Sequence, residues 1–498
     1  MVIKYINNSN GEFHMTIFKY KRAFTCFLTA LFISNTFLSS LLLSYAEEDY
    51  IQAAEARKSL AIQSNETTNW PQGPAIGAEA AILMEANTGT ILYAKNIHEK
   101  NYPASTTKIL TCLLATENSE MNEVVDYSTN AVFSIEKDSS NMGMDAGEKI
   151  TMEQSLYGVL VGSANEAANA VAEHISGSVE EFSKLMNQRA KELGCEDSHF
   201  VNPNGLYNDE HYTSAYDLAT IGRSFFKNEL LCKMSSTATY EIPPTATQPD
   251  DIYVHSKNKL LSSRECSYEY LVGSKTGFTS EARQTLVSCA KKDGITLICV
   301  IMKEESPNQF TDTVELFDYG FNNFQKINIS DNEVQYSINN NDLFNANEDV
   351  LGNSEPVLSL NKDDYIVIPK AAGFEDTTSS LTYDNTTDNS VASIDYSYND
   401  VSVGSVTVDL VNNSTNKLEL DTPLLQSTDN KKINNNEDVI FINVTKILFI
   451  IIIIASLLIS VFVIHSLIGN YNFSKRRRSK ASHKKRKKLP SKFDHFDF

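Results

Sequence analysis

The spacing of apolar positions divides residues 77–324 into strands, then helices, then strands again. Two short apolar runs around the turn "EANTG", within residues 77–96, predict a pair of strands. Apolar residues at helical spacing then predict helices over residues 103–116, 151–161, 165–175, 179–194, 213–226 and 310–324. Between the last two helices, long apolar runs predict antiparallel strands over residues 269–278, 283–294 and 295–303, with a hairpin turn at Lys291–Gly294. This order favours an α/β (α+β) domain in which helices surround an antiparallel sheet.

The composition changes after residue 325, where Asn, Asp, Ser and Thr dominate and short alternating apolar segments appear. These segments predict strands over residues 333–338, 365–370, 392–398 and 405–411. We therefore expect a small all-β domain over residues 326–412. The polar stretch that follows, residues 413–446, is typical of a flexible linker.

Two apolar segments near the ends of the chain predict export and membrane attachment. Basic residues precede an apolar run that ends in small residues at Ser44 and Ala46, which is typical of a signal peptide over residues 1–46. The same run could instead remain as an uncleaved anchor. Residues 447–469 contain no charged side chain and are long enough to span a bilayer. The basic tail at 470–498 then stays in the cytoplasm, so the remainder is expected on the outside of the cell membrane.

Charge and cysteine content exclude several classes of function. The net charge is −20 and the basic residues concentrate at the two ends, so the segment between them is strongly acidic and disfavours nucleic acid. The seven cysteines show no C-x-x-C spacing. We therefore expect no metal site, no cofactor and no disulfide. Cys112 and Cys299 lie in apolar runs and are expected to be small buried residues.

Candidate chemistry begins with "PASTTK", where Ser105 and Lys108 lie three residues apart at a predicted helix start. Residues at i and i+3 share one face of a helix. A serine hydroxyl becomes a nucleophile when a base lies within hydrogen-bond reach, and a lysine can be that base if it is neutral. The short motif alone is unspecific, and Ser105 could equally be a helix cap.

Two further motifs bear on this choice. Ser163 and Asn165 in "VGSANEAAN" fall in the break between two predicted helices, where Ser and Asn also serve as caps. Lys275, Thr276 and Gly277 in "VGSKTGF" fall on a predicted strand. Lys275 could depress the pKa of a second lysine, Thr276 could bind a carboxylate, and Gly277 would permit a close approach to the backbone.

The order S-x-x-K, S-x-N, K-T-G resembles the signature of penicillin-binding proteins and class A β-lactamases. The stretches "PASTTKILT", "VGSANEAANAVAEH", "FVNPNGLYNDEHYTSAYDLA" and "VGSKTGFTSEA" are similar to low-molecular-weight penicillin-binding proteins that act as serine D-alanyl-D-alanine carboxypeptidases. The resemblance covers residues 76–325. The β-rich segment 326–412 is similar to the small C-terminal domain of many such enzymes.

The resemblance implies a partner and a set of catalytic roles. The substrate would be a peptidoglycan stem peptide ending in D-Ala-D-Ala, and β-lactams would acylate the same serine. Ser105 would attack the carbonyl of the penultimate D-Ala and Lys108 would take its proton. Ser163 would relay a proton to the leaving D-Ala, Asn165 would position the substrate amide and Lys108, and Lys275 would hold Ser163 and supply positive field.

The resemblance also implies substrate-binding residues. Thr276 would receive the terminal carboxylate, and Lys257 in "HSKNKLL" would assist it. The backbone N–H groups of Ser105 and Phe278 would form the oxyanion hole beside Gly277. His211 in "HYTSAYDLA" is a family landmark for which packing or hydrogen bonding is expected.

One departure and several alternatives accompany this interpretation. The family usually shows K-T-G-x-T-x-x-A-G, whereas Arg283 here stands in place of the last glycine, at a cost if that position needs a positive φ. A β-lactamase would need an E-x-x-L-N loop, and the corresponding region here reads "HFVNPNGL". A transpeptidase or endopeptidase would share the motifs, and a wall-binding protein with a decayed site is the alternative from another class.

Overall fold

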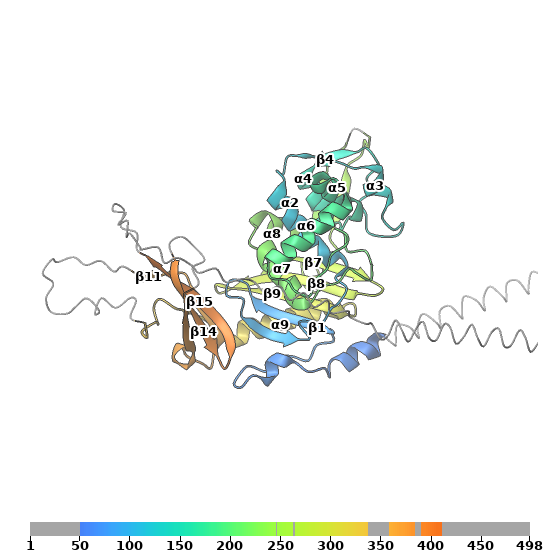
Figure 1. Cartoon of the computed structure of the whole chain (residues 1–498). Helices are drawn as coiled ribbons and strands as arrows, with labels where there is room; N and C mark the ends of the chain where they lie inside the picture. The colour runs from blue at the N-terminus through green and yellow to red at the C-terminus, as the bar shows by residue number, and fades with distance from the viewer. Residues whose placement is uncertain (1–49, 246, 262–263, 337–357, 384–389, 411–498) are drawn as a thin grey trace, which may run out of the picture. The chain divides into compact units, whose positions relative to one another are not determined.

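The computed structural model describes residues 50–245, 247–261, 264–336, 358–383 and 390–410 (Figure 1). The predicted signal peptide, linker, membrane span and basic tail lie outside these residues. Among the described helices, none has the length and apolar character required to cross a bilayer. By their contacts, the described residues all belong to one compact unit.

A five-stranded antiparallel sheet forms the centre of this unit, with strand order β2-β1-β9-β8-β7. Its strands are β1 (Ala80–Glu85), β2 (Ile91–Lys95), β7 (Leu271–Thr279), β8 (Arg283–Lys292) and β9 (Ile295–Glu304). Each strand predicted for this region is confirmed. The β8–β9 hairpin turns at Asp293 and Gly294, both at positive φ, as a tight two-residue hairpin requires.

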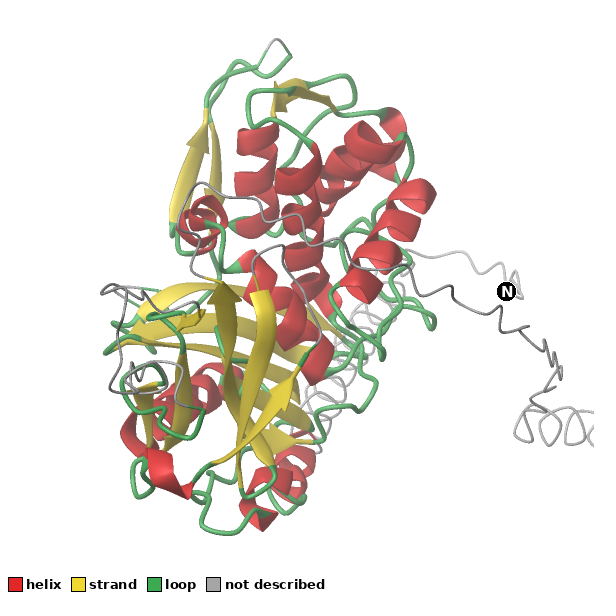
Figure 2. Cartoon of the chain, turned by 60° about the vertical axis from the view of Figure 1, so that its left-hand side comes forward, coloured by secondary structure: helices red, strands yellow, loops and turns green. Residues whose placement is uncertain are grey.

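Helices cover both faces of the sheet (Figures 1 and 2). Along β1, Ile82 packs with the larger group of helices, whereas Leu83 packs on the opposite face with α9 (Asn308–Asn323). The same alternation holds in β9, where Val300 and Cys299 face opposite sides. The strands are therefore buried on both faces, which explains why their sequences are continuously apolar.

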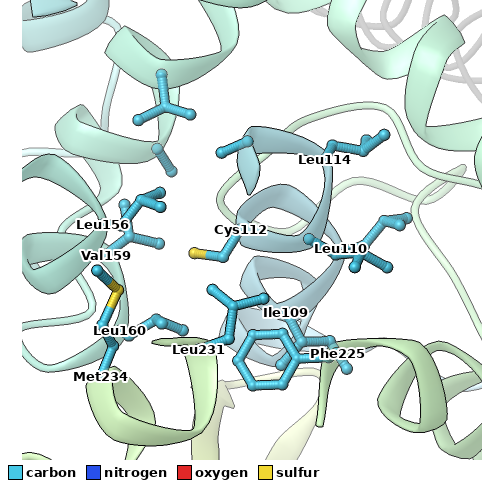
Figure 3. Packing of buried hydrophobic residues seen from close by; sticks show 14 of the residues in the cluster. Ile109, Leu110, Cys112, Leu114, Leu156, Val159, Leu160, Phe225, Leu231 and Met234 are labelled. Carbon is cyan, nitrogen blue, oxygen red and sulfur yellow. The ribbon is translucent and has the colours of Figure 1, made fainter. Parts of the chain in front are cut away.

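The larger group of helices forms an apolar core of its own over the sheet. In Figure 3, Ile109 and Cys112 from one helix meet Leu156, Phe225 and Met234 from three others. The predicted helices are confirmed as α2 (Lys108–Asn118), α4 (Met152–Leu160), α5 (Asn165–Ser176), α6 (Val179–Glu192), α7 (Ala215–Phe225) and α9. Elements that were not predicted are α3 (Thr129–Phe133), α8 (Glu229–Ser235), β3 (Val124–Asp126), β4 (Lys149–Thr151), β5 (Thr239–Ile242) and β6 (Ile252–His255).

The chain after α9 forms further antiparallel strands. β10 (Phe324–Asn328) pairs with β12 (Tyr365–Pro369), and a four-stranded sheet has the order β11-β15-β14-β13. Its members are β11 (Leu358–Leu360), β13 (Thr378–Thr382), β14 (Ser390–Tyr398) and β15 (Val401–Leu410). The Tyr365 hydroxyl donates to Glu85 Oε1 at 2.8 Å, which joins this region to the central sheet. The predicted boundary after residue 325 falls inside β10.

The strand predicted over residues 333–338 is wrong for its described part. Residues 333–336 form no strand, because the Glu333 carboxylate accepts the backbone N–H groups of Gln335 at 2.6 Å and Tyr336 at 3.0 Å. This local turn uses the N–H groups that a strand would pair. Val334 is 76% exposed, so the alternating pattern here does not mark a buried face.

Candidate active site

Ser105 lies in a 3-10 turn, η2 (Ala104–Thr107), that leads directly into α2. Its side chain does not cap the helix, so the capping interpretation is wrong. Instead, Ser105 Oγ lies 2.9 Å from Nζ of Lys108, the first residue of α2. The preceding Ala104 has a φ of 48°, a conformation that L-residues adopt at a cost of about 1–2 kcal/mol.

The Lys108 side chain is fully buried and has three polar contacts. Besides Ser105, its Nζ donates to Asn165 Oδ1 at 2.6 Å and to the backbone oxygen of Asn204 at 2.5 Å. Carbonyl oxygens only accept hydrogen bonds, so two N–H groups are assigned to them. A neutral lysine has two N–H groups and one lone pair, and the lone pair then faces the Ser105 hydroxyl. The geometry therefore suits a neutral Lys108 that removes the Ser105 proton.

Ser163 lies in the break between α4 and α5, as predicted, whereas Asn165 is the first residue of α5. Ser163 has a φ of 58°, so the chain reverses sharply there. The Lys275 ammonium donates to Ser163 Oγ at 3.0 Å and to the Thr276 backbone oxygen at 2.7 Å. Two separate lysine–serine pairs therefore meet at one site, and Asn165 belongs to the first of them.

The K-T-G motif lies within β7, where Gly277 packs against the turn that carries Ser105. A Cβ atom on Gly277 would lie 2.9 Å from Ser105 N, 3.0 Å from Pro103 O and 2.3 Å from Thr285 Oγ1. The distances to Ser105 N and Thr285 Oγ1 are shorter than real Cβ contacts, and the distance to Pro103 O is tighter than most of them. Gly277 is therefore required because the protein's own backbone approaches it, and this contact fixes Ser105 N beside β7.

Burial sets the protonation of both lysines. Loss of water around Lys108 holds its pKa well below 10.5, and the charge of Lys275 lowers that pKa further. Burial also lowers the pKa of Lys275 to about 7, while the thiol of Cys112 opposes this shift and Lys257 adds to it. The lowered pKa favours the neutral form of Lys108, which is the form that can act as a base.

A pocket of about 340 Å³ opens over these groups. Its lining includes Ser105, Ser163, Thr276, Gly277, Phe278 and Lys257, so the structure brings every sequence-predicted binding residue to one cavity. Phe278 is 53% exposed at the rim. Lys108, Asn165 and Lys275 lie directly behind this lining, through the hydrogen bonds given above.

Arg283 has a φ of 53°, a positive value that the glycine usual at this position in the family would adopt without strain. Its guanidinium donates to Glu305 from Nε at 3.1 Å and from Nη2 at 2.6 Å. It also stacks at 3.7 Å over the ring of Tyr50 and lies 5.6 Å from the ring of Phe278. The cost of the backbone conformation is thus offset by an ion pair and by ring contacts.

His211 forms hydrogen bonds that stabilise η2, the turn that carries Ser105, as expected. Val201 N donates to its Nδ1 at 3.1 Å, and its Nε2 lies 2.8 Å from Thr107 Oγ1. The Thr107 hydroxyl itself donates to Ala104 O, so Nε2 must carry the proton. Burial lowers the pKa of His211 to about 3, which keeps the ring neutral.

Sequence reasoning missed Asn204, whose backbone oxygen is the third partner of Lys108. Its side chain donates to Asn169 Oδ1 at 2.9 Å, which ties it to α5. The adjacent Gly205 has a φ of 83°, and a Cβ atom there would lie 1.9 Å from Ala104 O. The available signal was "NPNG", because Asn-Gly marks a turn with positive φ, although nothing in it indicates contact with a lysine.

Known proteins resemble this chain over the same region. A family model described as D-alanyl-D-alanine carboxypeptidase, peptidase S11, matches residues 66–306. The chain is 35% identical over 251 residues to the D-alanyl-D-alanine carboxypeptidase DacF of Bacillus subtilis, which is 50% of this chain and 63% of that protein. The chain thus spans less than two thirds of the length of this relative.

Two further relatives extend the comparison. The chain is 30% identical over 258 residues to the D-alanyl-D-alanine carboxypeptidase of Streptomyces sp. strain K15, which is 50% of this chain and 88% of that protein. The crystal structure of penicillin binding protein 6B from Escherichia coli superposes with a TM-score of 0.52 at 25% identity, over 69% of this chain and 98% of that one. The antiparallel sheet with its helices is therefore the fold of the penicillin-binding DD-peptidases. The chain belongs to the D-alanyl-D-alanine carboxypeptidase family, peptidase S11.

Proposed function

We propose that this protein is a serine D-Ala-D-Ala carboxypeptidase that removes the terminal D-Ala from peptidoglycan stem peptides and binds penicillin. The observation that carries this proposal is that Ser105 and Asn165 both contact the buried amine of Lys108, and that the Ser163–Lys275 pair lies at the same pocket. Family membership supports it, since the curated relatives bear the name of this activity.

In the first step, Ser105 Oγ attacks the carbonyl carbon of the penultimate D-Ala while its proton passes to the lone pair of Lys108. Negative charge develops on the carbonyl oxygen, and the backbone N–H groups of Ser105 and Phe278 stabilise it. The contact between Gly277 and Ser105 N supports this assignment, because it holds one donor in place beside β7.

In the second step, the carbon–nitrogen bond breaks and the departing amine of D-Ala receives a proton through Ser163. The 3.0 Å hydrogen bond from Lys275 holds the hydroxyl of Ser163, which lines the pocket. Water then attacks the Ser105 ester, which releases the shortened peptide and returns a proton to the enzyme. β-Lactams form the same ester with Ser105.

The carboxylate of the substrate is assigned to the Thr276 end of the pocket, where Lys257 supplies positive charge. The penultimate residue then lies over Gly277, and the remainder of the stem peptide extends toward Phe278. No metal or cofactor enters this mechanism, because the lysines supply the base and the positive field.

We further propose the cellular context that the sequence predicts. A signal peptide or retained anchor would export the chain, and residues 447–469 would attach it to the cell membrane with the basic tail inside. The β strands after residue 325 would form the small C-terminal domain of residues 326–412, which holds the catalytic part away from the membrane.

The proposed activity is tested by incubating the purified protein with diacetyl-Lys-D-Ala-D-Ala and measuring free D-Ala. The wild-type protein is expected to release D-Ala, and Ser105→Ala to release none. Adding a D-amino acid as acceptor distinguishes the transpeptidase alternative, in which an exchanged peptide forms in place of free acid. Absence of both products would reject the proposed activity.

A further inference from the structure

The first described segment, residues 50–57, is a helix whose C-terminal end is attached to the catalytic unit through Arg57 (Figure 1, dark blue). Arg57 Nε donates to the backbone oxygen of Gly77 at 2.8 Å, and Lys95 Nζ donates to the backbone oxygen of Arg57 at 2.8 Å. Arg57 Nη2 also lies 3.6 Å from Glu305 Oε1. Helix 50–57 is therefore fixed at this end against the central sheet and beside Glu305.

At the other end of the helix, Tyr50 contacts a side chain beside the active-site pocket. Cζ of Arg283 lies over the Tyr50 ring, 3.7 Å from its centroid, and is 5.6 Å from the centroid of the Phe278 ring. A guanidinium within about 6 Å of an aromatic ring is attracted to it. Phe278 lines the active-site pocket, so Arg283 connects Tyr50 with the wall of that pocket.

The ion pair between Arg283 and Glu305 joins two parts of the pocket wall. Arg283 directly precedes Gln284, and Glu305 directly precedes Ser306. Both Gln284 and Ser306 line the active-site pocket. The Arg283 guanidinium donates to Glu305 Oε2 from Nη2 at 2.6 Å, so the two parts of the wall are held together just outside the cavity. Helix 50–57 contacts both members of this ion pair.

Strand pairing connects Arg283 to the backbone of the pocket. Arg283 is the first residue of β8 and pairs with Thr279, the last residue of β7. The next pair along the hairpin is Phe278 with Gln284. A displacement of Arg283 is therefore transmitted within one residue pair to Phe278, whose backbone N–H is the proposed oxyanion donor. The glycine usual at position 283 in the family has no side chain that could contact helix 50–57.

We propose that helix 50–57 positions the oxyanion end of the pocket, with Tyr50 and Arg283 as the positioning residues that connect the helix to Phe278. This inference rests on the proposed function, in which the Phe278 N–H stabilises the developing oxyanion. An oxyanion donor accelerates acylation only when it is held where the negative charge develops. Tyr50 and Arg283 act through Phe278 and not by contact with the substrate, so they affect the rate of acylation more than substrate binding.

The test measures acylation of the full chain by labelled penicillin, as the first-order rate constant at saturation and the concentration that gives half of that rate. Tyr50→Ala should lower the rate constant about two- to fivefold, the factor that a cation–ring contact at an exposed site provides. The half-saturating concentration should keep its wild-type value, because the lost interaction belongs to the transition state. Tyr50→Phe should retain the wild-type rate constant, because the ring makes the contact with Arg283.

A double-mutant cycle shows whether Tyr50 acts through Arg283. In the Arg283→Gly background, Tyr50→Ala should cause no further decrease in the rate constant. A first-order rate constant does not depend on the folded fraction of the protein, so a loss of stability in Arg283→Gly does not enter the comparison. Tyr253→Ala is the matched control, because Tyr253 is a 53% exposed tyrosine in β6, and its replacement should leave the rate constant unchanged.

The outcomes separate this inference from the proposed function. An unchanged rate constant in Tyr50→Ala overturns the inference, and so does a decrease of the same size in the Arg283→Gly background. Absence of acylation in the wild-type protein rejects the proposed penicillin binding. Hydrogen exchange of residues 277–284, measured by mass spectrometry, then still decides the inference. Faster exchange in Tyr50→Ala than in Tyr50→Phe supports it, and equal exchange in the two variants overturns it.

Discussion

The Lys275 ammonium lies 3.0 Å from Ser163 Oγ and so joins two residues that are 112 positions apart in the chain. This bond connects β7 of the central sheet with the turn between α4 and α5. It brings the positive charge of Lys275 close enough to Lys108 to lower the pKa of that lysine. The sheet and the helices thus contribute jointly to one proton-transfer site.

Replacing Lys275 is expected to shift the pH dependence of acylation. Lys108 acts as a base in its neutral form, and the charge of Lys275 favours that form. Lys275→Gln removes the charge, so the pKa of Lys108 should rise and the acidic limb of the rate profile should move to higher pH. The measurement is the rate of penicillin acylation between pH 5 and 9. An unshifted acidic limb would show that burial alone sets the pKa of Lys108.

A methyl group on Gly277 should disable the oxyanion site. Gly277→Ala would place Cβ 2.9 Å from Ser105 N, so the turn that carries this donor must move. Loss of one oxyanion donor lowers kcat by about 10²–10³-fold, and acylation by penicillin should fall similarly. Gly222→Ala is the matched control, because its nearest neighbour lies at 3.4 Å, an ordinary contact. A Gly277→Ala protein with wild-type acylation would remove Ser105 N from the mechanism.

Arg283 should prove to be stabilising despite its backbone conformation. Arg283→Gly relieves about 1–2 kcal/mol of strain. It leaves the largely buried Glu305 with Arg57 as its one ion-pair partner among the described residues, with Arg57 Nη2 at 3.6 Å from Glu305 Oε1. Breaking a buried pair costs about 3–5 kcal/mol. We therefore expect a net loss of about 1–4 kcal/mol in the free energy of unfolding, measured by urea denaturation.

The double variant Arg283→Gly, Glu305→Gln provides the control for this prediction. It removes the charge of Glu305 together with that of Arg283, and should recover part of the lost free energy of unfolding. A single Arg283→Gly variant more stable than the wild-type protein would show that strain dominates at this position.

His211 should contribute to unfolding at acid pH. Its pKa of about 3 in the folded protein lies below the ordinary value of 6.5, so the unfolded chain binds the proton more readily. The stability that neutral His211 provides is therefore present above pH 6.5 and is lost as the pH falls toward 3. His211→Gln should show a shallower loss of unfolding free energy between pH 6.5 and 4. His255→Gln, at an exposed position, should retain the wild-type slope.

The three motifs predicted the site because each lies beside or within a helix or strand that the apolar pattern of the sequence reveals. The 3.6-residue period marked α4 and α5, so the break that holds Ser163 could be placed between them, just before Asn165. The approach of Asn204 O to Lys108 could not be predicted, because it depends on how a loop 96 residues away packs against α2. Every residue has a backbone carbonyl, so the residue type at position 204 does not indicate this contact.

The elements that were missed are short or governed by local polar contacts. α3 spans only Thr129–Phe133 and begins with a cap in which Ser128 Oγ accepts from Ala131 N at 2.9 Å. Such a helix has too few apolar positions for a period to emerge. At Glu333 the error is the reverse, because a strand was predicted where none forms. The Glu333 carboxylate accepts the backbone N–H groups that a strand would use to pair with its neighbour.

The central claim is that Ser105 is the acylated nucleophile, and labelled penicillin tests it most directly. The purified protein is treated with the label, digested, and the modified peptide is identified by mass spectrometry. We expect one label per chain on the peptide that contains Ser105, and none in Ser105→Ala. Absence of label from the wild-type protein, or label that persists at another residue in Ser105→Ala, would contradict the account.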